Sequence, residues 1–279
     1  MSKRAVLCSR CNKLVSGAAA VCPWCGARQP TLWGLGPGLR AWYRDTFEPV
    51  TMIMGLCVAL YGVSVMLKPE KALGGYDLFR FGSPDSEVLF HLGMTGYPAW
   101  GMGMYWTVLT ATWLHGGLLH IAFNLSWVRS LGPLAVEEFG PARFVILYIL
   151  SGVGGFLLSN LLSGSPTIGA SCAVFGMQGA LLAYGRRRGG TWGRSISREA
   201  LAYGVGGLVM SAALPGVNNL GHIGGILTGF ALGYLLPYKE RQVEARASQI
   251  VALILLAATA AGFAASIWQT RGVTGVFGQ

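Results

Sequence analysis

Residues 169–176, GASCAVFG, carry a serine at the mouth of an apolar segment, and residues 219–233, NLGHIGGILTGFALG, carry a histidine in a later apolar segment. A hydroxyl and an imidazole can act as a nucleophile and its base. What they can do depends first on whether both segments are membrane helices.

The composition of the chain indicates a polytopic membrane protein. Of its 279 residues, 53% are hydrophobic and only 11% are charged, with 42 glycines and a mean hydropathy of +0.51. Soluble domains have about a quarter charged residues. A helix that crosses a hydrocarbon core of about 30 Å needs roughly 20 mostly apolar residues. We expect seven such spans, with six as the alternative, at about 50–67, 113–133, 142–162, 169–186, 199–215, 219–236 and 249–268.

The distribution of Lys and Arg predicts the orientation, because positively charged loops remain in the cytoplasm. With a cytoplasmic N-terminus, all 21 basic residues fall on the inner side except Lys68, Lys71, Arg80 and Arg271. This spread over several inner loops also explains the net charge of +10 better than nucleic-acid binding does, since there is no single basic stripe. With seven spans, the C-terminus is expected outside.

Four cysteines at the head of the chain predict a metal site. Cys8, Cys11, Cys22 and Cys25 form C-x2-C-x10-C-x2-C, a spacing typical of structural zinc. The alternatives are two disulfides or a redox pair, but cytosolic thiols stay reduced and no thioredoxin-like pattern surrounds them. Metal binding would fold this short ribbon, because so few residues cannot bury a sufficient core. Four cysteine ligands leave no open position for catalysis.

The serine and histidine come out at similar depth in the predicted topology. Ser171 occupies the first turn of the fourth span, where unpaired amides and the helix dipole favour an oxyanion. His222 lies near the start of the sixth span, whose glycines recur every fourth residue and permit close helix contact (Gly221, Gly225, Gly229 and Gly233). We therefore expect the imidazole to reach the hydroxyl.

Two further polar residues lie near the same end of the second span. His120 and Asn124 are four residues apart, so they share a helix face, and both side chains can donate to a negative oxygen. No carboxylate lies in the spans nearby, which predicts a Ser–His dyad. Taken singly, each pattern is more typical of helix packing than of catalysis. Their occurrence together favours peptide hydrolysis within the bilayer.

Three segments resemble the signatures of rhomboid intramembrane serine proteases: GASCAVFG, HIAFN at 120–124 and GHIGG at 221–225. The resemblance implies Ser171 as nucleophile, His222 as base, and an oxyanion hole lined by His120, Asn124 and the Ser171 amide. It matches Gly169 to the glycine before the nucleophile, Phe175 to a ring that packs on the imidazole, and His115 to a structural histidine. Cys172 stands where the family usually has glycine, and Thr107 where it usually has arginine.

The resemblance implies an all-α membrane protein with a six-helix rhomboid-like core, to which this chain adds a C-terminal helix and the cytosolic ribbon. The expected domains are the zinc ribbon (1–28), a juxtamembrane linker (29–49), the protease core (50–237) and the loop, extra helix and outer tail (238–279). The expected activity is cleavage of single-span membrane proteins in a bacterial plasma membrane, with the active site toward the outer face. Structural Zn²⁺ is the only cofactor expected, and the ribbon is expected to contact a cytosolic partner.

An inactive rhomboid-like client-binding protein is the main alternative to the protease. A transporter or channel is disfavoured because internal repeats and a path of ionisable residues are not evident.

Overall fold

The computed structural model describes residues 5–8, 13–16, 19–26, 28, 48–73, 81–214, 216–238 and 245–276. Cys11 and most of the predicted linker, residues 29–47, lie outside these ranges. The chain divides into two compact units, residues 1–52 and 53–279. In the first unit, β1 (Ala5–Leu7) pairs antiparallel with β2 (Leu14–Ser16).

The rest of the described chain is mostly helical, as predicted. Each of the seven expected windows carries a long helix: α2 (Pro49–Met66), α7 (Leu118–Phe139), α8 (Pro141–Leu162), α9 (Ser171–Arg188), α10 (Gly190–Ala212), α11 (Asn219–Leu235) and α12 (Arg246–Gln269). By length and composition, three helices of the described residues are apolar enough to cross a membrane, namely α2, α8 and α12.

Two helices extend furthest beyond the predicted windows. Helix α10 begins at Gly190 instead of 199, and α7 continues to Phe139 instead of ending at 133. Apolarity defines the predicted windows, whereas both extensions contain charged residues, such as Arg194 and Glu137, which are exposed. Long polar side chains at a helix end can reach water while the helix continues.

The connection between α2 and α7 contains short helices. They are α3 (Pro69–Leu73), α4 (Ser86–His91), α5 (Tyr97–Gly101), α6 (Thr107–Thr110) and η1 (Ala111–Trp113). Several apolar residues of α4 and α5 form a buried cluster with Met104 and Leu114.

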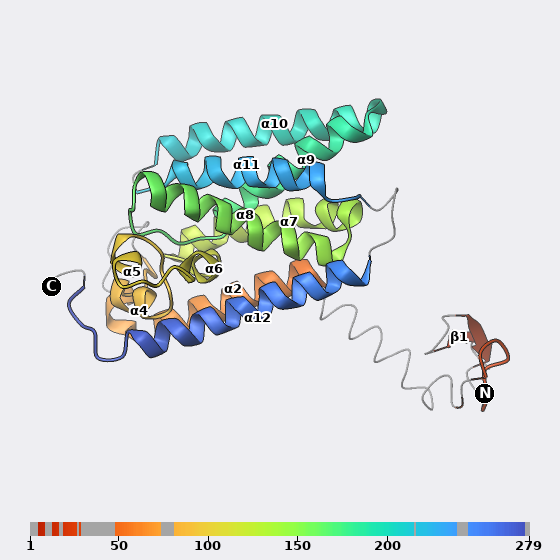
Figure 1. The fold of residues 1–279 in the computed structure, drawn as a ribbon, viewed down its shortest axis with the longest axis horizontal. Coiled ribbons are helices and arrows are strands. Elements are labelled where there is room, and N and C mark those ends of the chain that lie inside the picture. Colours follow the sequence, from red (N-terminus) through yellow and green to blue (C-terminus); the bar gives the residue numbers. More distant parts are fainter. Residues whose placement is uncertain are drawn as a thin grey trace. The chain divides into compact units, whose positions relative to one another are not determined.

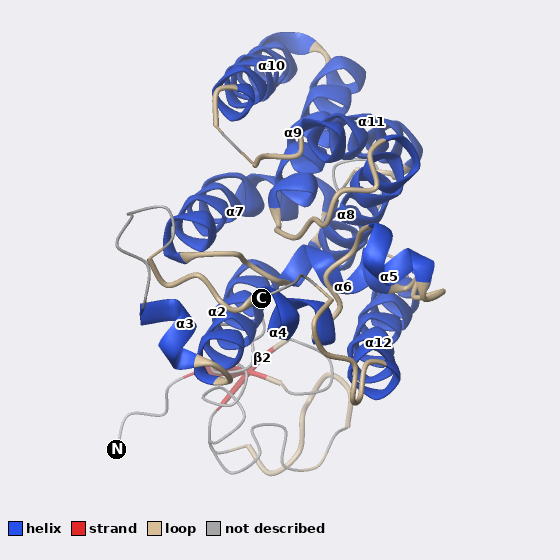
Figure 2. Ribbon diagram, turned by 90° about the vertical axis from the view of Figure 1, so that its left-hand side faces the viewer, coloured by secondary structure: helices blue, strands red, loops and turns tan. Residues whose placement is uncertain are grey.

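The long helices of the second unit lie side by side. In two perpendicular views, α10 lies at one edge and α12 at the opposite edge, with α8, α9 and α11 between them (Figures 1 and 2). Helix α9 contacts α7, α8, α10 and α11, and most of its residues are buried. The serine at its first position is therefore held by a helix that is surrounded by others.

Close contact between α9 and α11 depends on glycine. A Cβ at Gly225 would overlap with the carbonyl of Cys172, and one at Gly229 would overlap with the backbone of Gly176. Backbones can approach this closely only where side chains are absent. The glycine repeat of α11 thus sets how near the histidine helix comes to the serine helix.

Two arginines stabilise the opposite ends of these helices. Arg187 donates to the carbonyls of Gly233 and Leu236 at 2.7 and 2.8 Å, at the C-terminus of α11. Arg143, which is buried, donates to the carbonyls of Phe139 and Pro237 at 3.3 and 3.0 Å. The last carbonyls of a helix have no partner within it and carry partial negative charge, so guanidinium groups are favourable there.

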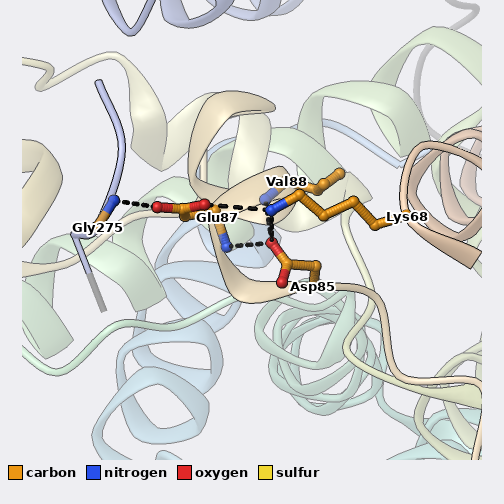
Figure 3. A network of polar contacts seen from close by, with 5 residues as sticks. All are labelled: Lys68, Asp85, Glu87, Val88 and Gly275. Carbon is orange, nitrogen blue, oxygen red and sulfur yellow. Dashed lines mark hydrogen bonds and ion pairs between the residues drawn. The ribbon is translucent and has the colours of Figure 1, made fainter. Parts of the chain in front are cut away.

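Helix α12 and the residues after it are fastened to the α2–α7 connection. The indole of Trp106 donates to Ser266 Oγ at 3.1 Å, and the side-chain amide of Gln269 donates to the carbonyl of Met102 at 2.7 Å. The amide of Gly275 donates to Glu87 (Figure 3). The extra helix therefore contributes to the order of this long connection.

Glu87 also belongs to a group of charged residues that we call the connection ion-pair cluster, made of Lys68, Asp85 and Glu87 (Figure 3). Lys68 Nζ lies 3.0 Å from Asp85 Oδ1 and 3.1 Å from Glu87 Oε2. Asp85 caps α4 by accepting from the amides of Glu87 and Val88. Partial burial alone would raise the pKa of Asp85, but the hydrogen bonds from Lys68 and the cap amides outweigh it and lower the pKa. The Gly275 amide, and then Lys68, lower the pKa of Glu87.

Candidate active site

Ser171 is the first residue of α9 and follows a turn whose backbone favours glycine. Gly169 has φ +126°, a conformation that favours glycine, and its amide donates to the carbonyl of Ala111 at 2.9 Å. Two backbone hydrogen bonds between Thr95 and Thr167, at 3.3 and 2.9 Å, tie the preceding loop to the α2–α7 connection. The amides of a first helical turn lack partners within the helix. The serine is thus presented beside amides that have no acceptor within the helix.

His222 comes from the first turns of α11 and lies next to the serine. Its Nε2 atom is 2.9 Å from Ser171 Oγ, a normal hydrogen-bond length. The imidazole is buried, with 5% of its surface exposed. The sequence predicted that these two residues, on different helices, would meet, and the structure brings them together. A nucleophile and a base in hydrogen-bond contact are the minimal unit for attack by a hydroxyl.

The ring of Phe175, one turn further along α9, stacks on the imidazole of His222. The ring centroids are 4.3 Å apart and the planes differ by 27°. Offset stacking of flat rings is favourable and restricts rotation of both. The apolar ring therefore limits the orientations that the base can adopt.

His120 projects from α7 toward the same turn. A Cβ built on Gly169 would lie 2.6 Å from His120 Nε2, so this nitrogen lies directly beside the backbone that precedes Ser171. The Gly116 amide donates to His120 Nδ1 at 3.2 Å. Since Nδ1 accepts, neutral His120 must carry its proton on Nε2. The imidazole thus offers an N–H donor toward the loop.

Asn124 supplies a second donor from the same face of α7. Its Nδ2 atom lies 3.8 Å from the Cβ position of Gly169, and it donates one hydrogen to the carbonyl of His120 at 2.9 Å. An amide nitrogen carries two hydrogens, so one remains for another acceptor. Both residues that the sequence proposed for an oxyanion hole therefore lie beside the turn that leads to Ser171.

Two other residues singled out in the sequence are buried in the helix packing. Cys172 is buried, with its Sγ atom between Gly155 of α8 and Gly221 of α11. The side chain that replaces the usual glycine thus fills a helix interface. His115 is fully buried, and its ring packs edge-on against His120 at 5.3 Å between centroids, which fits a structural role.

Several polar residues near the site were not singled out from the sequence. Ser211 of α10 and Asn219 of α11 both lie 3.3 Å from His222 Nδ1. Asn218 caps α11 by accepting from the Gly221 amide, and it donates to Thr167 Oγ1 at 2.8 Å. The pair Asn218–Asn219 before an apolar helix is a capping signal. Nothing local in the sequence, however, connects Ser211 with the histidine.

In the N-terminal unit, the three predicted metal ligands that lie among the described residues are close together. The sulfur atoms of Cys8, Cys22 and Cys25 all lie within 4.8 Å of one another, and those of Cys8 and Cys25 are 3.8 Å apart. Thiolates that share one tetrahedral zinc at about 2.3 Å are themselves about 3.8 Å apart. The donor set and its spacing therefore fit a zinc ion.

The chain is similar in sequence to known rhomboid proteins. Residues 102–239 match the Rhomboid domain family. The chain is 33% identical over 182 residues to the Rhomboid protease GluP of Bacillus subtilis (strain 168), in a match that spans 65% of this chain but 36% of that protein. It is 30% identical over 262 residues to RHOMBOID-like protein 7 of Arabidopsis thaliana, spanning 85% of this chain and 82% of that protein. It is also 32% identical over 161 residues to Inactive RHOMBOID-like protein 8 of Arabidopsis thaliana, spanning 57% of this chain and 46% of that protein.

Proposed function

Because the chain belongs to the rhomboid family of membrane proteins, we propose that it is an intramembrane serine endopeptidase that cleaves single-span membrane proteins. The observation that carries this proposal is the 2.9 Å contact between Ser171 Oγ and His222 Nε2 in a buried site. His120 and Asn124 add donors beside the same turn. One relative is named a protease, which agrees with this assignment.

The geometry supports a two-step acyl transfer. Ser171 Oγ attacks the peptide carbonyl while its proton passes to His222 Nε2. The Nε2–H of His120, the amide of Asn124 and the Ser171 backbone N–H stabilise the resulting oxyanion. His222 then protonates the leaving amine as the C–N bond breaks. A water molecule gives a proton to His222 and attacks the acyl ester, and Ser171 regains its proton as it leaves.

The proposed substrate is a membrane helix that can unwind locally. An intact helix uses its carbonyls in internal hydrogen bonds, which hides them from a nucleophile. Glycine and other small residues lower the cost of unwinding. We therefore expect cleavage sites in segments that are rich in such residues.

The test is cleavage of a tagged single-span reporter in membranes that contain the protein or its variants. Wild-type protein should release the tagged fragment, and Ser171→Ala and His222→Ala should not. Ser163→Ala, in the exposed loop before α9, is the matched serine control and should cleave normally. Equal cleavage by all variants would show that another protease is responsible.

A second candidate function is a catalytically inactive protein that binds membrane clients, since one relative is named inactive. A serine-directed phosphonate distinguishes the two. The protease should be labelled, and the label should disappear in Ser171→Ala. Folded protein that takes up no label, while still retaining a reporter helix, would favour the binding function.

We further propose that Cys8, Cys11, Cys22 and Cys25 hold structural Zn²⁺ in a ribbon (1–28) that contacts a cytosolic partner. The proposed linker (29–49) joins it to the protease core (50–237), and the remaining segment (238–279) adds α12. When bound, zinc would hold the two cysteine pairs together and play no part in the hydrolysis. Purified protein should contain about one zinc per chain, and replacement of Cys22 by serine should remove it without abolishing reporter cleavage.

The proposed location is a bacterial plasma membrane, with the N-terminus in the cytoplasm and the site toward the outer face. The orientation is supported by basic residues, including Arg186 and Arg187, at the C-terminal end of α9, which is the end away from Ser171. Reporter enzymes fused at each terminus would test the orientation. A cytoplasmic signal from the C-terminal fusion would contradict it.

A further inference from the structure

The second ring nitrogen of His222 has two oxygen neighbours. While Nε2 faces Ser171, Nδ1 lies 3.3 Å from Ser211 Oγ and 3.3 Å from Asn219 Oδ1. These oxygens come from different elements, the end of α10 and the first turn of α11. The base is thus held between Ser171 on one side and a polar pair on the other.

The hydrogen bonds of this pair determine which nitrogen of His222 carries the proton. A side-chain amide oxygen only accepts. Ser211 Oγ has one hydrogen, and its two other oxygen neighbours are Asn219 Oδ1 at 2.5 Å and the carbonyl of Leu208 at 3.0 Å. Either of them takes that hydrogen, so the serine oxygen presents a lone pair to Nδ1. An unprotonated Nδ1 would then place its lone pair against two oxygen lone pairs.

We propose that Ser211 and Asn219 act as positioning residues that hold His222 in the Nδ1–H tautomer. Nε2 then carries the lone pair that faces Ser171 Oγ, as a general base requires. In serine-protease triads a buried carboxylate performs this task. Here a neutral pair performs it, which avoids the cost of a charge at membrane depth. This inference rests on the proposed function and extends it, because Ser211 and Asn219 join the Ser–His dyad as the residues that position the histidine.

The pair also completes the proton transfer. When Ser171 attacks, its proton moves to Nε2, and the ring becomes an imidazolium with N–H groups at both nitrogens. The Nδ1–H remains hydrogen-bonded to Ser211 and Asn219 throughout, while the Nε2 proton goes on to the leaving amine. Phe175 stacked on one face of the ring supports the same orientation. No rotation of the ring is then needed during the reaction.

The tautomer can be measured directly by nitrogen NMR of protein labelled with ¹⁵N-histidine in detergent micelles. The chain has four histidines, and a His222→Gln sample assigns the signal of interest. Wild-type protein should show a protonated Nδ1 and an unprotonated Nε2 for His222. A dominant Nε2–H form in the wild type would overturn the proposal. Because this measurement requires no cleavage, its outcome is independent of whether the protein proves to be a protease.

Variants connect the tautomer with catalysis. In the Ser211→Ala, Asn219→Ala double variant, the Nδ1–H form should lose its dominance, and kcat should fall on the order of 10- to 100-fold with little change in KM. Ser211→Thr keeps the hydroxyl and should keep both properties. A folded double variant with wild-type tautomer and kcat would overturn the proposal. If the double variant does not fold, the same comparison is made with the two single variants, and an unchanged tautomer and an unchanged kcat in both Ser211→Ala and Asn219→Ala would overturn it.

Asn218→Ala is the matched control. Asn218 caps α11, and its side-chain amide bonds to Ser159 and Thr167. Its loss should lower thermal stability and leave the tautomer of His222 unchanged. If it altered the tautomer as much as the double variant does, general loosening of α11 would explain both effects, and the specific role of the pair would be refuted.

Discussion

Replacing Gly169 with alanine should both strain the backbone and displace the oxyanion donor His120, and a matched control variant separates these two effects. The φ of +126° is costly for any residue with a Cβ, by roughly 1–3 kcal/mol. The new Cβ would also lie 2.6 Å from Nε2 and 2.8 Å from Cε1 of His120. His120 accepts from the Gly116 amide at 3.2 Å, so the ring cannot move away without losing that bond.

Loss of one oxyanion donor lowers kcat by about 100- to 1000-fold in serine proteases. We therefore expect Gly169→Ala to unfold at lower temperature and to lose about 100-fold in kcat. Gly164→Ala is the matched control, because Gly164 also has a positive φ, +67°, but its Cβ would lie no closer than 3.7 Å to another side chain. It should lose about 1 kcal/mol of stability and keep its kcat.

The assay combines reporter cleavage in proteoliposomes with thermal unfolding in detergent. Wild type and both variants are compared at a temperature where all three are folded. A kcat for Gly169→Ala within about twofold of wild type would refute the assignment of His120 as a donor, since such a donor contributes far more than that. An equal loss in Gly164→Ala would show that strain in the loop, and not the contact with His120, limits the rate.

Three further outcomes are expected. Phe175→Ala should lower kcat/KM about 2- to 10-fold by removing the stacked ring beside His222, and unaltered cleavage would contradict a role for the ring. Gly229→Ala should destabilise the protein by about 1–3 kcal/mol, because its Cβ overlaps with Gly176, whereas Gly206→Ala, with open space around it, should be neutral or stabilising in thermal unfolding. The carboxylates of the connection ion-pair cluster have pKa values below their ordinary 3.8 and 4.5. Their contribution to stability is therefore present above about pH 4.5 and is lost as the pH falls through the lowered values. In a variant with both carboxylates replaced by amides, the melting temperature should fall less between pH 5 and pH 3 than it does in the wild type. If the melting temperatures of variant and wild type fell equally with pH, the cluster would not contribute to stability.

Much of the fold could be predicted because membrane helices are read from local composition. A run of about 20 apolar residues has few alternatives to a helix in a bilayer, and each expected window carries one in the described chain. The ends were less predictable, as α10 shows, since a helix can continue into polar residues once it has begun. The short helices of the α2–α7 connection escaped prediction because their order depends on distant partners such as Ser266 and Gln269.

The sequence by itself determined the kinds of chemical group available: a serine at a helix start, a histidine beside a glycine repeat, and cysteines at metal-ligand spacing. These follow from residue type and spacing along one segment, which are local properties. Only the tertiary structure decided that Cys172 fills a helix interface, and that Ser211 and Asn219 lie against the second nitrogen of His222. The contacts of Cys172 and Ser211 join residues on different helices, so spacing along one segment does not predict them, and the fit of Cys172 depends on how closely the glycine-lined backbones of α9 and α11 pack.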